Sequence, residues 1–251
     1  MSTPLSSLVT FGRTVLGGVT QLVYPNTCWI CGIVMPATQV QVCSSCLPQL
    51  TVDPFATCPR CSSTVGPHSA FPDGCPACRG EAFAFDGAFR MAPYEGLARE
   101  VILRTKQWTG EDLAEVIATI WAKSLAPRLR PLTPEVTIPI PLHWTRRWRR
   151  GFNSCDILAM GLARELAIPC VTAAIRRVRA TASQTDQPSA TARRDNVKHA
   201  FEAHRGEQLQ GKTVLLIDDV LTTGATASEA ARALRVHKPK AIYVVVLAHG
   251  R

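Results

Sequence analysis

Two patterns of apolar residues follow one another along most of the chain. Short continuous apolar runs are typical of buried strands, and apolar residues spaced three or four apart are typical of helices. Strands are predicted at 83–94 (with a turn at Asp86-Gly87), 136–140, 175–178, 213–217 and 241–247. Helices are predicted at 97–107, 112–125, 153–166 and 226–236, with a further amphipathic helix at 8–24. Strands separated by helices predict an α/β fold with a largely parallel sheet. The polar stretch 180–196 is predicted to be a long loop.

The segment 26–80 lacks this pattern and carries cysteines instead. Eight of the ten cysteines form Cys-x-x-Cys pairs, and two pairs together supply the four thiolates of a closed, structural zinc site. In chain order the first site would be Cys28, Cys31, Cys43 and Cys46, and the second Cys58, Cys61, Cys75 and Cys78. A cross-braced pairing stays open, and four disulfides of a secreted domain are the less favoured alternative. The remaining two, Cys155 and Cys170, are predicted to be packing residues.

We therefore predict two domains, a helix with a double zinc ribbon at 1–82 and an α/β domain at 83–251. The composition, 46% hydrophobic and 19% charged, is that of a globular protein. Through residue 139 the chain has ten basic and ten acidic residues, whereas 140–251 carry 18 basic and nine acidic residues. The whole +9 net charge therefore lies in 140–251, which indicates a localised anionic partner. The apolar stretch 241–248 is far shorter than the ~20 residues that span a bilayer, so we expect no membrane span and a cytoplasmic protein.

A buried strand that leads into two carboxylates and a Thr-Gly loop is the strongest chemical signal. Asp218 and Asp219 follow the apolar run 213–217, and the loop Thr222–Thr226 leads into a helix. Ligands bind at the carboxyl ends of parallel strands, and the N–H groups of a helix N-terminus favour a phosphate. Two carboxylates beside it suit ribose hydroxyls with Mg²⁺ nearby, so the pattern predicts a ribose 5-phosphate pocket. The alternative is an ordinary helix with Thr223 as N-cap and a solvated Asp pair.

These residues resemble the phosphoribosyl pyrophosphate (PRPP) signature of type I phosphoribosyltransferases. The stretches 138–143 (Ile-Pro-Ile-Pro-Leu-His) and 149–153 (Arg-Arg-Gly-Phe-Asn) resemble the central motif of the ComF family. The residues at 179–184 and 194–201 resemble the family as well, as does the N-terminal zinc ribbon. Members of this family are associated with natural competence and with handling incoming single-stranded DNA. The resemblance implies a type I phosphoribosyltransferase fold, a parallel sheet flanked by helices, preceded by a small zinc-ribbon domain.

The resemblance also implies a ligand and roles for residues. PRPP with Mg²⁺ would place its 5-phosphate on the Thr-Gly loop, its ribose near the Asp pair and its pyrophosphate near the turn after residue 138. Catalytic roles are implied for Asp218, Asp219 and Lys106, while the acceptor, and whether turnover occurs, stay open. The expected PRPP-binding residues are Asp218, Asp219, Thr222, Thr223, Gly224, Ala225, Thr226, Pro139, Ile140, Pro141 and Leu142.

A basic stretch with two tryptophans allows two interpretations. Arg146, Arg147, Arg149 and Arg150 lie among Trp144 and Trp148, and Arg179 borders the polar loop. In the first interpretation the arginines contact pyrophosphate and the indoles pack inward. In the second they hold single-stranded DNA, with phosphates on Arg and bases stacked on Trp.

The sequence thus supports a phosphoribosyltransferase. The alternative is a non-catalytic DNA-handling protein that keeps a PRPP pocket as sensor or vestige. Other competence or DNA-uptake proteins are further expected partners.

Overall fold

The computed structural model describes residues 25–36, 41–66, 71, 74–179, 195–204 and 208–250. The chain divides into two compact units, Met1–Gln49 and Leu50–Arg251. The predicted helix at 8–24 and most of the predicted loop at 180–196 lie outside the described residues. The predicted domain boundary after residue 82 stays a prediction.

The described part of the first unit carries the first two Cys-x-x-Cys pairs. Thr27 and Val34 form an antiparallel bridge around the first pair. The second pair leads into the short helix α2 (Cys46–Thr51), which runs across the boundary between the units.

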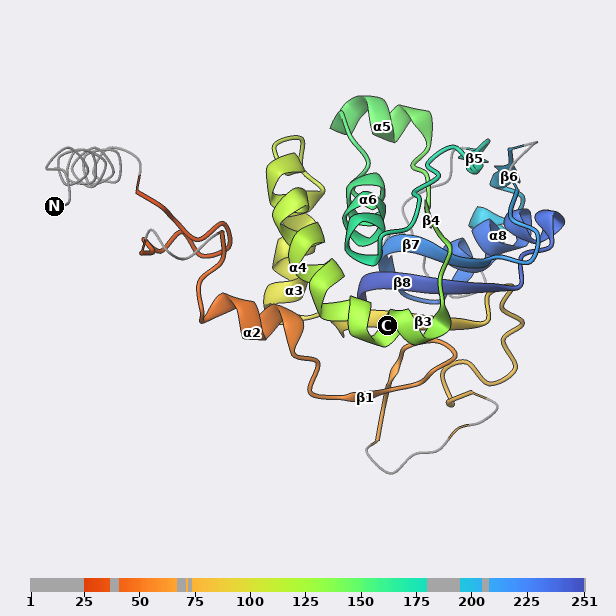
Figure 1. Cartoon of the computed structure of the whole chain (residues 1–251), viewed down its shortest axis with the longest axis horizontal. Helices are drawn as coiled ribbons and strands as arrows, with labels where there is room; N and C mark the ends of the chain where they lie inside the picture. Colours follow the sequence, from red (N-terminus) through yellow and green to blue (C-terminus); the bar gives the residue numbers. More distant parts are fainter. Residues whose placement is uncertain are drawn as a thin grey trace, which may run out of the picture. The chain divides into compact units, whose positions relative to one another are not determined.

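A four-stranded, fully parallel sheet forms the centre of the second unit, in the order β3-β8-β7-β4 (Figure 1). Its strands are β3 (Gly87–Pro93), β4 (Val136–Pro139), β7 (Thr213–Leu221) and β8 (Ala241–His249). The two central strands are rich in Val, Ile and Leu and largely buried, as parallel strands covered on both faces are. The predicted parallel α/β sheet is confirmed.

Alternate strand residues face different helices. Leu216 of β7 packs in one cluster with Ala230 and Leu234 of α8 (Ala225–Leu234). Thr137 of β4 pairs with Leu215, the neighbour of Leu216 on β7. The Thr137 hydroxyl donates to the Ala159 carbonyl of α6 (Ser154–Leu166) at 3.1 Å. Since side chains alternate along a strand, α6 and α8 lie on opposite faces of the sheet.

The remaining helices are α3 (Gly96–Thr105), α4 (Glu111–Leu129) and α5 (Trp144–Arg150), with short 3₁₀ turns at Arg130–Leu132 and Arg235–His237. Helix α4 packs closely on α6, where a Cβ added to Gly161 would lie 3.0 Å from the Cβ of Ala118. Among the helices of the described residues, none combines the length and apolar character that a bilayer crossing needs.

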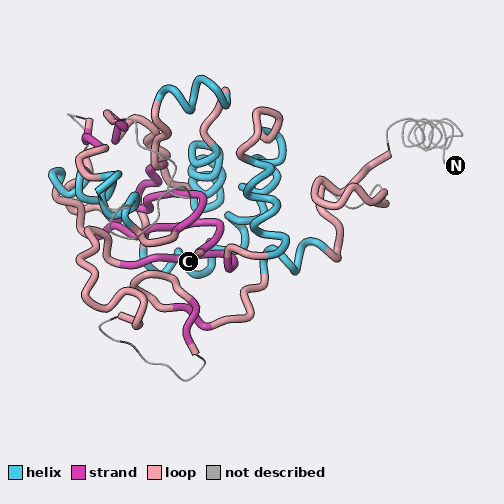
Figure 2. Tube along the Cα trace, turned by 180° about the vertical axis from the view of Figure 1, so that it is seen from behind, coloured by secondary structure: helices cyan, strands magenta, loops and turns pink. Residues whose placement is uncertain are grey.

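Two small antiparallel hairpins complete the second unit. One joins β1 (Ala56–Thr57) to β2 (Thr64–Val65), and the other joins β5 (Ile175–Arg177) to β6 (Phe201–Ala203). The N–H of Ala88 donates to the carbonyl of Pro59 at 3.1 Å, so the β1–β2 hairpin lies alongside β3, as both views of the chain show (Figures 1 and 2).

Strand β7 differs from its prediction in a way that bears on the site. We predict its end at residue 217, but it continues to Leu221, because Asp218, Val220 and Leu221 still pair with β8. The Asp pair therefore lies within the strand. Helix α5 and strand β6 escape prediction, since one lacks an apolar period and the other has only three residues.

Candidate functional site

A cavity of about 230 Å³ lies at the carboxyl ends of β4 and β7, where parallel sheets bind ligands. It brings together the turn after β4, the Asp pair, two residues of the Thr-Gly loop and several cations from other elements. Its lining residues are Tyr94, Lys106, Ile140, Pro141, Leu142, Arg146, Arg150, Cys155, Arg177, Asp218, Asp219, Val220, Thr222 and Thr226.

Asp218 is a partly buried carboxylate with two close partners. The Sγ of Cys155 lies 3.6 Å from its Oδ1, and the backbone N–H of Asp219 donates to the same oxygen at 2.9 Å. Burial and then the charge of Asp219 raise the pKa of Asp218 to about 7. Near neutral pH this carboxylate therefore exchanges a proton readily, and an arriving cation favours its ionised form.

Asp219 is paired with Lys106, the C-cap residue of α3. Their Nζ and Oδ2 atoms lie 2.7 Å apart. Burial disfavours the ammonium, but the charge and hydrogen bond of Asp219, with the charge of Asp218, outweigh it and raise the pKa of Lys106. Lys106 is therefore charged at neutral pH.

Three arginines add further positive charge to the cavity. Arg146 and Arg150 lie one turn apart on α5, and Arg177 ends β5. Burial lowers the pKa of Arg150 and of Arg177, although a guanidinium stays protonated in proteins. With Lys106, four cations face two carboxylates, so the cavity favours an anionic ligand.

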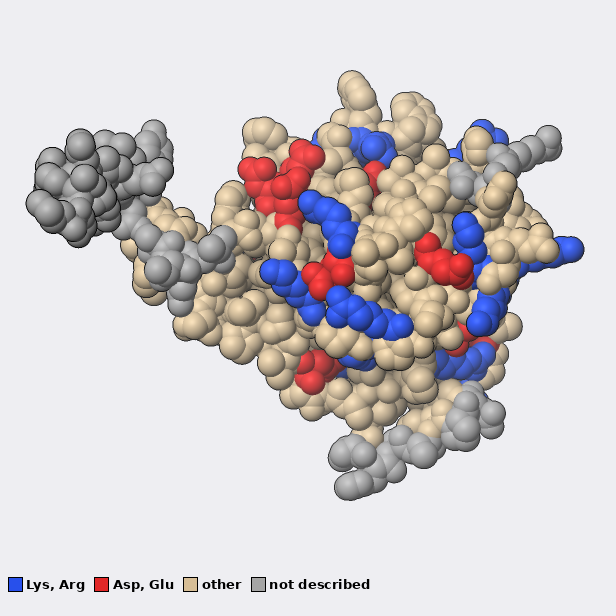
Figure 3. Space-filling model, viewed as in Figure 1, with Lys and Arg blue, Asp and Glu red and all other residues tan. Residues whose placement is uncertain are grey.

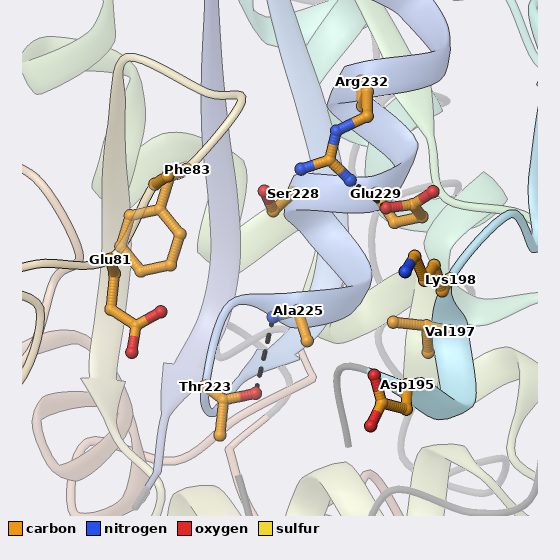
Figure 4. Close-up of a pocket in the computed structure, with 11 residues that line it drawn as sticks. Glu81, Phe83, Asp195, Val197, Lys198, Thr223, Ala225, Ser228, Glu229 and Arg232 are labelled. Atoms are coloured by element: carbon orange, nitrogen blue, oxygen red, sulfur yellow. Dashed lines mark hydrogen bonds and ion pairs between the residues drawn. The ribbon is translucent and has the colours of Figure 1, made fainter. Parts of the chain in front are cut away.

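The Thr-Gly loop is held in a backbone conformation that requires glycine. Gly224 has a φ of 75°, and an added Cβ would lie only 2.9 Å from Cε1 of Phe83. It is Gly224, rather than Thr223, that occupies the N-cap position of α8. The hydroxyl oxygen of Thr223 accepts a hydrogen bond from the N–H of Ala225 at 3.4 Å (Figure 4).

Thr223 and Ala225 line a second cavity, of about 320 Å³, beside the first turns of α8 (Figure 4). Some of its polar groups have partners within the second unit. Arg232 pairs with Glu229, and Ser228 accepts a hydrogen bond from the N–H of Ala84 at 3.0 Å. Its mixed charges give no preference for an anion.

Each four-cysteine group forms one cluster. Within each cluster the four sulfur atoms lie within 4.8 Å of one another, grouped as Cys28, Cys31, Cys43 and Cys46 and as Cys58, Cys61, Cys75 and Cys78. The chain-order pairing is confirmed, and all ten cysteines are free thiols rather than disulfides. Four sulfur donors in one cluster fit a tetrahedral zinc ion and leave no open coordination position, which suits a structural role.

Backbone N–H groups favour the thiolates of Cys28 and Cys43 in the first cluster and of Cys58 in the second, where they lower the thiol pKa. Burial raises the pKa of Cys28, but surrounding backbone N–H donors outweigh it and lower that pKa to about 6. The same balance lowers the pKa of Cys58 to about 7. Since metals bind thiolates rather than thiols, both clusters contain a sulfur suited to start metal binding.

Comparisons with known proteins agree with this architecture. The phosphoribosyl transferase domain model matches residues 153–251. The chain is 31% identical over 216 residues to the DNA utilization protein YhgH of Escherichia coli O157:H7, covering 85% of this chain and 92% of that protein. It is 32% identical over 200 residues to Competence protein F of Haemophilus influenzae, covering 77% and 84% respectively. The chain belongs to the ComF family.

This ComF-family chain has the phosphoribosyltransferase fold, a parallel sheet flanked by helices. Among solved structures it is similar to the glutamine PRPP amidotransferase from B. subtilis, with 22% identity and a TM-score of 0.36. That likeness covers 53% of this chain and only 25% of the other. The matched domain contains β7, α8 and β8, whereas Tyr94 and Lys106 of the cavity precede it.

Several residues predicted to contact a ligand lie away from the cavity lining. Arg147 pairs with Asp156 at 3.0 Å, and Arg149 is exposed on α5. Arg179 donates to backbone carbonyls of Asp195, Asn196 and Lys198. Pro139 is a buried residue of β4, next to the lining turn.

Sequence reasoning missed Tyr94, Cys155, Arg177 and Val220 as lining residues. Cys155 is buried, as predicted for a packing residue, but its sulfur also touches Asp218. Tyr94 directly follows β3, so the rule that ligands bind beyond the carboxyl ends of strands could have indicated it. Arg177 carries no such signal, because its position depends on the β5–β6 hairpin.

Proposed function

We propose that this ComF-family protein binds PRPP with Mg²⁺ in the cavity at the ends of β4 and β7. The observation that supports it most is the gathering of four cations and two carboxylates beside the N-terminus of α8. PRPP has complementary groups in one molecule: a 5-phosphate, two ribose hydroxyls and a pyrophosphate.

The charges suggest how the ligand lies. The N–H groups at the start of α8 suit the 5-phosphate, and Asp218 and Asp219 suit the ribose hydroxyls. Arg146 and Arg150 then lie on the side of the pyrophosphate, next to the turn at 140–142. Carboxylates are hard oxygen donors of the kind that Mg²⁺ accepts, and the ion would neutralise part of the pyrophosphate charge.

In a transfer reaction, the bond from the anomeric carbon to pyrophosphate breaks and the leaving group carries the electron pair. The cations Lys106, Arg146 and Arg150 are placed to stabilise that negative charge. A screen of bases and amines for pyrophosphate release identifies the acceptor, whose electron pair forms the new bond to the anomeric carbon. Binding of PRPP without pyrophosphate release in the presence of any acceptor points to a sensor of PRPP.

Two fragments of PRPP, Mg²⁺-pyrophosphate and ribose 5-phosphate, are used separately to test the proposed arrangement. By calorimetry, Arg150→Gln should weaken Mg²⁺-pyrophosphate binding about tenfold, since a charge-assisted hydrogen bond contributes ~1.5 kcal/mol, and leave ribose 5-phosphate nearly unaffected. Thr226→Val should do the reverse. Arg149→Gln, an exposed charge on the same helix, is the matched control. If the wild-type protein binds neither part, the proposal fails.

Helix α5 supports a second candidate function, the binding of single-stranded DNA. Trp144 and Trp148 are 70% and 87% exposed, which disagrees with the first interpretation, in which the indoles pack inward, and agrees with the second. They lie four residues apart, so they share one side of the helix, and Lys and Arg side chains gather over α5 (Figure 3). Exposed indoles among guanidinium groups suit stacked bases and phosphates. The relatives' names, DNA utilization protein and Competence protein F, support a role with DNA.

This second function is tested with a labelled oligonucleotide across salt concentrations. Trp144→Ala with Trp148→Ala should weaken binding at every salt concentration by about 2–6 kcal/mol, the contribution of two stacked bases. Arg147→Ala with Arg149→Ala should reduce the salt slope by about 1.4. Lys123→Ala with Lys240→Ala removes two exposed charges elsewhere as a control. An unchanged affinity and slope in both α5 variants would remove α5 from the DNA interface.

A further inference from the structure

The second cysteine cluster lies in the same compact unit as the cavity, and two series of contacts lead from it to the Thr-Gly loop. The first begins at Cys61, whose Sγ lies 3.2 Å from the hydroxyl of Ser63. The Ser63 hydroxyl is in turn 3.2 Å from Nε2 of His249, and both residues are buried. A cysteine of the cluster is therefore one side chain away from the central sheet.

His249 connects this contact to the cavity. It ends β8 directly opposite Leu221, the last residue of β7 before the Thr-Gly loop. The N–H of Gly250 donates to the Leu221 carbonyl at 2.9 Å. On the other side, the His249 carbonyl accepts the N–H of the cavity residue Tyr94 at 2.7 Å. Movement of His249 would therefore shift both the start of the loop and one cavity wall.

The second series begins at Arg60, which lies between Cys58 and Cys61. Its guanidinium donates to the carbonyls of Cys78 and Glu81 and lies 5.5 Å from the ring centroid of Phe83. Phe83 is the residue whose ring occupies the space beside Gly224. Arg60 thus joins the two halves of the cluster and supports the ring that packs against the loop.

We propose that Arg60, Ser63 and Phe83 are positioning residues that transmit the geometry of the second cysteine cluster to residues 222–226. A metal that fixes the four sulfurs also fixes Arg60 and Cys61, and through them both sides of the loop. The metal site then sets the order of the loop and its affinity for a phosphorylated ligand. The effect on affinity rests on the proposed PRPP function, whereas the effect on loop order does not.

Hydrogen exchange of the amides of 222–226 in the ligand-free full chain tests the effect on loop order. Ser63→Ala should accelerate exchange at least fivefold while the zinc content stays at the wild-type value. Ser62→Ala is the matched control, because Ser62 is equally buried and its hydroxyl has no hydrogen-bond partner among the described residues. Equal exchange in Ser63→Ala and Ser62→Ala would overturn the proposal.

A second pair of variants covers the case in which Ser63→Ala fails to fold. His249→Gln keeps a hydrogen-bonding atom near Ser63 and should retain wild-type exchange, whereas His249→Leu removes it and should accelerate exchange. Identical exchange in the two variants would overturn the proposal.

Titration with Mg²⁺-PRPP then tests the effect on affinity. Arg60→Gln should weaken binding about tenfold with the zinc content unchanged, and Arg79→Gln, an exposed charge beside the same cluster, should not. Accelerated loop exchange in Ser63→Ala, with no PRPP binding by the wild-type protein, would support the positioning role and reject the PRPP function.

Discussion

Burial and the neighbouring Asp219 make Asp218 costly to ionise in the folded chain. Its pKa is about 7, against an ordinary value of 3.8, so the folded state binds this proton more tightly than the unfolded state does. This tighter proton binding contributes fully to the free energy of unfolding below about pH 4, and the contribution is lost as the pH rises toward 7. Above pH 7 the folded protein carries the full cost of a charge that a bound cation can offset.

Asp218→Asn should therefore stabilise the ligand-free protein at pH 8. One unit of pKa corresponds to about 1.4 kcal/mol, and with part of the shift shared with Asp219 we expect a gain of about 1–3 kcal/mol. The gain should shrink toward pH 5. Urea unfolding at both pH values measures it, with Glu115→Gln, an exposed carboxylate, as the control. A gain that is the same at both pH values would contradict the raised pKa.

At the scale of elements, the β7–α8 connection depends on one glycine and one ring. Gly224→Ala should destabilise the fold by about 1–2 kcal/mol for the left-handed backbone, and by more because the new Cβ meets Phe83. Gly211→Ala has the same backbone cost, with a φ of 72°, and no atom within 4 Å of the new Cβ. Thermal unfolding compares the two. Equal losses would mean that Phe83 does not constrain the loop.

The elements that the sequence predicts well are those whose own residues determine them. The apolar runs of β7 and β8 and the helical spacing of α6 identify these elements without knowledge of their neighbours. The extension of β7 through Asp218 and Asp219 depends on pairing with β8, because carboxylates are poor strand formers and only the ladder holds them there. The same holds for the three-residue strand β6, which exists through its partner β5.

The residues of the candidate site likewise fall into those that the sequence predicts and those that only the fold brings together. The Asp pair, the Thr-Gly loop and the turn after β4 were predictable, because each is a continuous stretch at the end of a strand. Cys155 and Arg177 come from other elements, and only the folded sheet brings them to the cavity. The division of the α5 arginines was also unpredictable: Arg146 and Arg150 line the cavity, whereas Arg147 and Arg149 do not.

At the scale of the whole chain, five of the basic residues after residue 139 lie at the two candidate binding surfaces. Three of them line the cavity, where the anionic ligand is proposed, and two are exposed on α5 beside two tryptophans. The cysteine clusters contribute sulfur ligands rather than basic side chains, and the second of them lies against the sheet that carries the cavity. The central claim for the whole molecule is therefore ligand binding at the ends of β4 and β7.

Calorimetric titration of the full chain with PRPP, with and without Mg²⁺, tests that claim most directly. Wild-type protein should bind one PRPP per chain, more tightly with Mg²⁺ and at pH 8 than at pH 6. Asp218→Asn with Asp219→Asn should weaken binding at least tenfold, since the ribose hydroxyls lose two charged acceptors of their hydrogen bonds. Glu100→Gln with Glu115→Gln, which removes two exposed carboxylates, should bind as wild type does. No binding by the wild-type chain, or equal binding by the Asp218/Asp219 double variant, would contradict the account.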